Sequence, residues 1–270
     1  MTHSDQELIC LYCVAEAAPD LAALTSPVVD LRAIAHRDLH AVVSNVSELE
    51  FNEQALTQNL KNPEWLKPKV RRHESVIEAV MRQQTVAPFK FATLFRTEDS
   101  LKACLDQHYA VLKAALAEFK GRQEWRVIIY CQRQKLQEAL ATQDETLQDL
   151  DARIAKADQD TAVLLRKQRE DTLRVLVERK LLDYSQDCFD RLSDVSLKAR
   201  LNPPLPGEVT PQHEEMILHA AFFIEAAKHS VLMGEGYKLK ADYEDKGLRL
   251  DCTGPWPPYN FCSFAKSSDS

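Results

Sequence analysis

The first half of the chain contains four short apolar runs that predict β-strands. Two of them, Glu7–Val14 and Leu39–Val46, have the length and the β-favouring residues of ordinary strands. Val28–Ile34 is a third candidate, and Val86–Phe95 is a fourth. We therefore expect a sheet in this half of the protein.

Between these runs the apolar residues change to helical spacing. The residues from Val70 to Met81 repeat at intervals that place them on one face of a helix, which starts near Pro63. A second helix is expected after the capping residue Thr97, and Gly121 ends it. With the strands, these helices complete one α+β domain.

The second half opens with a strand, Glu124–Cys131, that is too apolar to be exposed on both faces. From Gln132 to about Leu192 there is neither proline nor glycine, and good helix formers dominate. One very long helix or a helical hairpin would fit. The heptad spacing fails at Gln168 and Asp171, so we expect a helical arm rather than a sustained coiled coil.

Three further strands follow the arm, at Val195–Leu201, Met216–Ile224 and Leu248–Thr253. A helix from Ala226 to about Asp245 separates the last two. The order strand, helix, strand, strand, helix, strand is that of a split βαβ, or ferredoxin-like, domain.

The 270 residues are enough for two ordinary domains. We expect the division near Gly121, because a complete set of strands and helices lies on either side. The predicted fold class is therefore α+β with two domains. The parts are a mixed α+β sheet domain at 1–122, a ferredoxin-like domain with a helical arm at 123–266, and a tail at 267–270.

Charge and glycine content narrow the possible functions. The 34 basic and 41 acidic residues give a net charge of −7, which disfavours nucleic acid and anionic lipid as partners. Only six glycines are present, and Gly234-Glu235-Gly236 lacks the third glycine and the lysine of phosphate-binding loops. Glu225 and Lys228 interrupt the longest apolar region, Met216–Met233, so we expect buried core there rather than a membrane span. The first thirty residues show no cationic start followed by an uninterrupted apolar region, so we expect a cytoplasmic protein.

No combination of residues predicts a catalytic centre, a cofactor or a metal site. Cys10 and Cys13 form a CxxC, but positions three apart on a strand point to opposite faces, so we interpret both as buried small hydrophobic residues. Glu-x-x-x-His pairs begin at Glu215 and Glu225. The first would not converge on a metal, because His219 lies in a strand-like run.

Two motifs in the first half carry candidate binding residues. Arg71–Glu74 places charge and an imidazole on one helix. A solvated helix face explains this pattern as well as a function does, and if it has a function, binding of a partner fits better than catalysis. In the expected strand, Phe89, Phe91 and Phe95 would share one side. Core packing explains them better than an RNA-binding sheet, whose glycines and basic surroundings are absent.

The segment Thr253–Phe261 contains three prolines and therefore predicts a rigid, extended strap that cannot continue a central strand. Trp256, Tyr259 and Phe261 could lock this strap onto its own C-terminal domain or present it to a partner. We favour the lock.

These motifs, with Glu124–Val127, resemble the motifs of the GvpF/GvpL family of gas vesicle proteins, both in their residues and in their order along the chain. The sequence differs from the family at Phe89-Lys90, at Ala92, where glycine is usual, and at His219, where asparagine is common. The motif positions proposed for partner binding are Arg72, His73, Glu74, Pro88, Lys90, Phe91, Thr93, Phe95, Gly254, Pro255, Trp256, Pro257, Pro258, Tyr259 and Phe261.

The resemblance implies a two-domain α+β protein that is not an enzyme and has no cofactor. It implies an accessory or minor structural protein of gas vesicle assembly, which binds the hydrophobic shell protein GvpA, assists nucleation and limits aggregation of that protein. Other gas vesicle accessory proteins are further implied partners. A net charge of −7 fits such a role, because a charged protein can keep an apolar subunit dispersed.

Two other classes of protein stay open from the sequence alone. The first is a non-enzymatic regulatory or nucleic-acid-binding module on a ferredoxin-like fold, which the net charge of −7 disfavours. The second is an enzyme, which would need a deep pocket containing strongly perturbed carboxylates or histidines.

Overall fold

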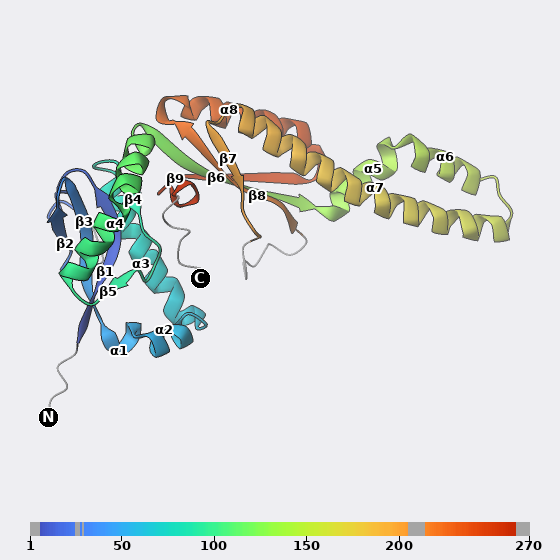
Figure 1. Ribbon diagram of the computed structural model, residues 1–270. Coiled ribbons are helices and arrows are strands. Elements are labelled where there is room, and N and C mark those ends of the chain that lie inside the picture. The colour runs from blue at the N-terminus through green and yellow to red at the C-terminus, as the bar shows by residue number, and fades with distance from the viewer. Residues whose placement is uncertain (1–5, 25–27, 29, 205–213, 263–270) are drawn as a thin grey trace. The chain divides into compact units, whose positions relative to one another are not determined.

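The computed structural model describes residues 6–24, 28, 30–204 and 214–262 and shows an α+β protein with two antiparallel sheets (Figure 1). This confirms the predicted fold class. The chain divides into two compact units. The first unit contains the residues up to Gln123 together with the segment from Pro255, and the second unit contains Glu124–Gly254. The predicted tail, 267–270, lies outside the described residues.

The sheet of the first unit is built around its first strand, β1, which is buried along almost its whole length. The strand order is β2 (Arg32–His36), β3 (Leu39–Ser47), β1 (Glu7–Ala15) and β4 (Ala87–Pro88), with β5 (Leu94–Phe95) also pairing with β1. The strand expected at Val28–Ile34 is thus found slightly later, as β2, where it forms a hairpin with β3.

Two helices cover the two faces of this sheet. The apolar residues of α3 (Pro63–Met81) pack on one face, and those of α4 (Glu98–Phe119) pack on the other. Pro63 occupies the first turn of α3, and Thr97 forms a capping box with Ser100 at the start of α4. Both predicted helices are confirmed. Two short helices, α1 (Glu48–Phe51) and α2 (Glu53–Asn59), connect β3 to α3.

A β-bulge in β1 changes which residues share a face. Leu11 pairs with Val43 and Cys13 pairs with Val42, so Tyr12 is the extra residue between them. As a result Cys10, Tyr12 and Cys13 all belong to the cluster beneath α3. The expectation that Cys10 and Cys13 point to opposite faces is therefore wrong, although both are buried and free.

The segment Val86–Phe95 is not one continuous strand, as the sequence predicts, but two short strands joined by a turn. The backbone N–H of Thr93 donates to the carbonyl of Lys90 (3.2 Å), and Ala92 has a left-handed φ of 62°. The turn cancels the expected alternation of the aromatic residues. Phe89 packs with the α4 face of the sheet, whereas Phe91 lies elsewhere, at a pocket described below.

The second unit contains a four-stranded sheet in the order β7 (Lys198–Leu201), β8 (Glu214–Glu225), β6 (Arg122–Gln132) and β9 (Leu248–Trp256). Along the chain the order is strand, helices, strand, strand, helix, strand, which is the order expected of a split βαβ fold. α8 (His229–Tyr243) lies between β8 and β9, flanked by short 3₁₀ helices at Ala226–Lys228 and Glu244–Lys246.

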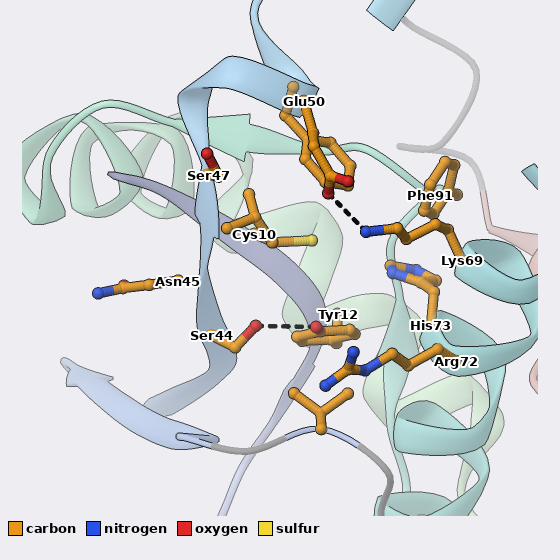
Figure 2. Close-up of a pocket in the computed structure, with 13 residues that line it drawn as sticks. Cys10, Tyr12, Ser44, Asn45, Ser47, Glu50, Lys69, Arg72, His73 and Phe91 are labelled. Atoms are coloured by element: carbon orange, nitrogen blue, oxygen red, sulfur yellow. Dashed lines mark hydrogen bonds and ion pairs between the residues drawn. The ribbon is translucent and has the colours of Figure 1, made fainter. Parts of the chain in front are cut away.

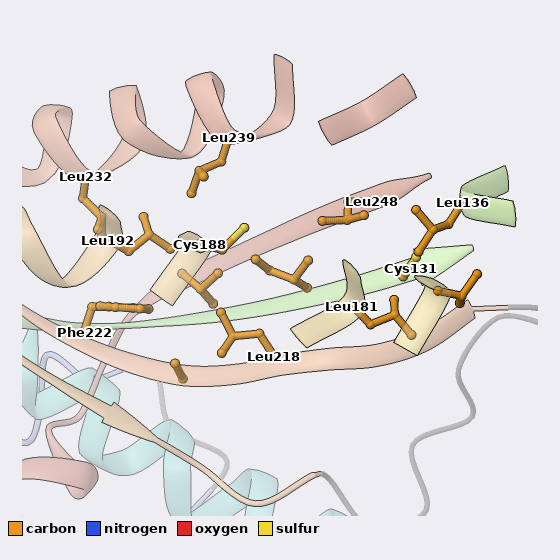
Figure 3. Close-up of a cluster of buried hydrophobic side chains, with 14 of the residues drawn as sticks. Cys131, Leu136, Leu181, Cys188, Leu192, Leu218, Phe222, Leu232, Leu239 and Leu248 are labelled. Carbon is orange, nitrogen blue, oxygen red and sulfur yellow. The ribbon is translucent and has the colours of Figure 1, made fainter. Parts of the chain in front are cut away.

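One face of this sheet forms the core of the second unit with α7 and α8 (Figure 3). Leu232 and Leu239 of α8 approach Phe222 and Leu218 of β8 together with α7 residues such as Leu192. Phe222 is fully buried. The strands contribute every second residue to this cluster, and α7 and α8 contribute residues three, four or seven positions apart. These are the spacings expected of one face of a strand and one face of a helix.

The helical region after β6 forms a hairpin arm (Figure 1). It consists of α5 (Arg133–Gln143), α6 (Glu145–Ile154) and α7 (Gln159–Asp194). Asp144 and Asp158 cap the starts of α6 and α7 with their side chains, which explains why a region without proline or glycine is not one helix. Among the described residues, no helix is both long and apolar enough to cross a membrane.

Changing Ala92 to glycine is expected to stabilise the protein. A left-handed backbone costs a non-glycine residue about 1–2 kcal/mol, and the greater freedom of glycine in the unfolded chain offsets about half of the gain. Ala92→Gly should therefore raise the free energy of unfolding in urea by about 0.5–1 kcal/mol.

The matched control is Ala117→Gly, at an exposed position within α4. That change should lower stability by about 1 kcal/mol. A loss of stability for both variants would contradict the strained turn.

Candidate partner-binding site

Two of the motifs that the sequence singles out in the first half contribute residues to a pocket of about 170 Å³ in the first unit (Figure 2). Its walls come from β1, β3, α1, α3 and the turn after β4. Lys69, Arg72 and His73 lie three and four residues apart on α3, so the helix presents all three to the pocket. The bulge in β1 brings Tyr12 to the same place.

His73 is a buried polar group of this pocket, and only 3% of it is exposed. Its Nε2–H donates to the carbonyl of Phe89 at 2.9 Å, which assigns the proton to that nitrogen. Its ring lies 5.0 Å from the ring of Tyr12 and meets that of Phe91 edge-on at 5.7 Å. Burial lowers the pKa of His73 to about 4, so the imidazole is neutral near pH 7.

Two other titratable groups of the pocket are also held in their neutral form. Burial raises the pKa of the Cys10 thiol to about 12 and that of Tyr12 to about 12. The Tyr12 hydroxyl forms a hydrogen bond with the hydroxyl of Ser44 (2.9 Å). A protonated thiol is a poor nucleophile, so the chemistry of this pocket favours binding over covalent catalysis.

Aromatic rings form the wall next to α1. Phe51 lies 5.3 Å from Trp65 and 6.2 Å from Phe91 between ring centroids. The ammonium of Lys69 lies 5.6 Å from the centre of the Phe51 ring and pairs with Glu50 at 2.5 Å. The wall is therefore apolar, with one neutralised charge at its rim.

Arg72 differs from Lys69, because the part of the chain that the structure describes offers its guanidinium no carboxylate. Its side chain reaches toward Tyr12 and Ser44 (Figure 2), and its positive charge is close enough to favour ionisation of Tyr12. The pocket thus contains one positive charge that is not neutralised.

The other first-half motif residues do not line this pocket. Glu74 follows His73 on α3, and Pro88 is buried in β4, where it pairs with Cys13. Lys90 and Thr93 form the turn, with Lys90 exposed. Phe95 packs on the α4 side of the sheet.

The C-terminal strap lies on the first unit, which corrects the prediction that it locks onto the C-terminal domain. Tyr259 packs against the cluster beneath α3, and its electrostatic neighbours include Glu74 and Glu78 of that helix. Pro257, Pro258 and Cys262 are buried. Tyr259, Asn260 and Phe261 form a 3₁₀ turn. The expectation of a lock stays, but its target is different, because aromatic and apolar residues of the strap fit the core next to α3.

The start of the strap belongs to the edge strand β9, which ends at Trp256 and includes Pro255. Gly254 is required by close packing within the second unit. A Cβ atom at this position would lie 2.9 Å from the Trp125 ring and 3.0 Å from the carbonyl of Glu124. Gly254 and Trp125, from two of the predicted motifs, are therefore in direct contact.

Sequence reasoning missed several residues that line the pocket, namely Tyr12, Ser44, Phe51 and Lys69. The spacing of Lys69 with His73 could have indicated a shared helix face. No pattern in the sequence predicts the β-bulge that places Tyr12 at the pocket. Among the described residues, no three His, Cys, Asp or Glu side chains gather closely enough to hold a metal ion.

Comparison with known proteins gives consistent similarities over nearly the whole chain. A family model described as gas vesicle synthesis protein GvpL/GvpF matches residues 8–263. Gas vesicle protein L1 of Halobacterium salinarum is 26% identical over 257 residues, or 93% of this chain and 89% of that protein. Gas vesicle protein L of Haloferax mediterranei is 26% identical over 206 residues, or 74% of this chain but only 63% of that protein.

The same similarity is present in three dimensions. The crystal structure of the gas vesicle protein GvpF from Anabaena superposes with a TM-score of 0.65 at 18% sequence identity, covering 97% of both chains. At this identity the comparison shows a shared fold.

Acid should destabilise the protein through His73. The pKa of this side chain is about 4 when folded and 6.5 in its ordinary state, so the unfolded chain takes up a proton first as the pH falls. Above pH 6.5 His73 is neutral in both the folded and the unfolded chain, so it does not lower the free energy of unfolding. The free energy of unfolding should decrease by about 3 kcal/mol as the pH falls to 4.

The test compares urea unfolding of the unchanged protein and of His73→Gln between pH 7 and pH 4. Glutamine retains an N–H donor for the Phe89 carbonyl but does not titrate. The variant should therefore lose less stability than the unchanged protein over this range. Equal losses would show that His73 does not titrate as inferred.

Removing the ring of Tyr259 should destabilise the first unit specifically. Loss of a packed aromatic ring costs about 2–4 kcal/mol, so Tyr259→Ala should speed amide hydrogen exchange in β1 and α3. Exchange in β6 and β8 should change little. Tyr237→Ala, at a side chain that is 74% exposed, is the matched control and should change stability by less than about 0.5 kcal/mol.

Proposed function

Because the chain belongs to the gas vesicle synthesis protein GvpL/GvpF family, we propose that it is a non-enzymatic accessory protein of gas vesicle assembly that binds the shell protein GvpA. In this proposal it assists nucleation of the shell and limits aggregation of the free shell protein. The family match over residues 8–263 confirms the resemblance predicted from four short motifs.

The observation that carries the proposal is that Arg72 and His73 of one motif and Phe91 of another line one pocket. His73 binds the backbone next to Phe91, and the ring of Phe91 packs against His73. Residues separated in the sequence therefore build one concave surface with an aromatic wall, which is the kind of surface that receives a side chain of a partner protein.

The charge of the molecule supports the second part of the role. A net charge of −7 on the accessory protein would keep a complex with an apolar subunit dispersed, because like-charged complexes repel each other. Binding at a small pocket leaves most of this charged surface facing water.

The test dilutes GvpA from denaturant in the presence of the full-length chain. We expect the chain to delay the rise in light scattering and to co-purify with GvpA, whereas an unrelated protein of similar net charge should do neither. Phe91→Ala, at the pocket, should weaken both effects.

The matched variant is Tyr237→Ala, which lies at an apolar pocket of the second unit and should behave as the unchanged chain. Circular dichroism checks that both variants are folded. Absence of any complex between GvpA and the unchanged chain would refute the proposed function, and an effect of Tyr237→Ala alone would move the binding surface to the second unit.

A further inference from the structure

The pocket of the first unit carries a local positive charge on an acidic protein. α3 contains Lys67, Lys69, Arg71 and Arg72 within six residues, whereas the whole chain has a net charge of −7. Of these four cations, Lys69 and Arg72 line the pocket. The pocket is therefore a place where an anionic group is favoured locally on a surface that repels anions generally.

Pairing within the pocket determines how many negative charges a ligand should bring. Glu50 already neutralises Lys69. Arg72 has no carboxylate partner among the described residues, and its side chain extends toward Tyr12 (Figure 2), whose hydroxyl forms a hydrogen bond with Ser44. One unneutralised cation matches one negative charge. A phosphate dianion would bring a second charge that no unpaired cation among the described lining residues of the pocket balances.

Shape and polarity point to the same class of ligand. A volume of about 170 Å³ is roughly that of five or six water molecules, enough for the side chain of an aspartate or glutamate. The rings of Phe51 and Phe91 offer an apolar wall for the residue next to it. His73 Nδ1 is buried and without a hydrogen-bond partner among the described residues, so a backbone N–H of the ligand would satisfy it.

We infer that this pocket binds a carboxylate side chain of the partner, held by the guanidinium of Arg72, with an adjacent apolar residue against Phe51 and Phe91. The inference rests on the proposed function, in which that partner is GvpA. Arginine suits this task because its planar guanidinium can form two parallel hydrogen bonds to one carboxylate.

The first experiment measures capture of GvpA by the full-length chain carrying Arg72→Glu, Arg72→Lys or Arg71→Glu. Loss of a charge-assisted pair should weaken capture about 10-fold or more for Arg72→Glu. Arg72→Lys should be intermediate, because lysine keeps the charge but not the two parallel bonds. Arg71→Glu makes the same charge change one residue away, outside the pocket lining, and should bind as the unchanged chain.

A charge-reversal scan identifies the carboxylate. Each Asp and Glu of GvpA is changed in turn to lysine and tested against the Arg72→Glu chain. One of these changes should restore capture, because it recreates the ion pair in the opposite sense. Capture of unchanged GvpA by Arg72→Glu at full strength, or an equal loss with Arg71→Glu, would overturn the inference while leaving the proposed function in place.

The second experiment does not depend on GvpA. The peptide acetyl-Leu-Glu-Leu-amide is titrated into the full-length chain with ¹⁵N-labelled tryptophan, and the indole signal of Trp65, next to Phe51 and Phe91, is assigned with Trp65→Phe. The signal should shift with this peptide. With the control peptide in which glutamine replaces glutamate, the signal should shift only at about 10-fold higher peptide concentration, or not at all. The same result is expected when the glutamate peptide is titrated into the Arg72→Glu chain.

Inorganic phosphate is the competing probe in the same titration. A shift at lower concentration with phosphate than with the glutamate peptide would make the pocket a phosphate site, and equal shifts with the glutamate and glutamine peptides would show that no carboxylate is recognised. Either result overturns the inference. If GvpA is not captured at all but the glutamate peptide binds through Arg72, the proposed function fails and the carboxylate site stands.

Discussion

The hydrogen bond from His73 to the carbonyl of Phe89 connects the helix and the turn on which the pocket depends. It is formed in a buried environment, where an unpaired carbonyl would cost about 1–3 kcal/mol, so it holds the end of β4 close to α3. Once this end is held, Phe91 is placed against the imidazole and Arg72 is placed one residue away from the anchored position. Burial keeps this histidine neutral by lowering its pKa, whereas the hydrogen bond to the Phe89 carbonyl acts in the opposite direction.

Both ends of the chain contribute to the first unit. β1, near the N-terminus, is the central strand of the sheet, and Tyr259, near the C-terminus, packs against the cluster on one face of that sheet. The first unit therefore lacks part of its packing until the end of the chain is present. This arrangement gives a physical role to the prolines of the strap, because a segment with fixed φ angles loses less conformational entropy when it docks.

In the proposed function, the distribution of charge would separate two tasks of an assembly protein. A net charge of −7 would keep molecules apart, while the unneutralised Arg72 in the pocket would provide a specific attraction. Because Glu50 neutralises Lys69, Arg72 is the charged group of the pocket that a negatively charged partner would bind.

Local signals in the sequence were sufficient for most helices, for the strand order of the second unit and for the family. Helical spacing in α3 and a capping residue at Thr97 act over a few neighbouring residues, so they can be read without the fold. The bulge at Tyr12, the left-handed turn at Ala92 and the destination of Tyr259 could not be read in this way. Each is decided by packing between segments far apart in the chain, and the pocket exists only because these long-range contacts bring Tyr12, Arg72, His73 and Phe91 together.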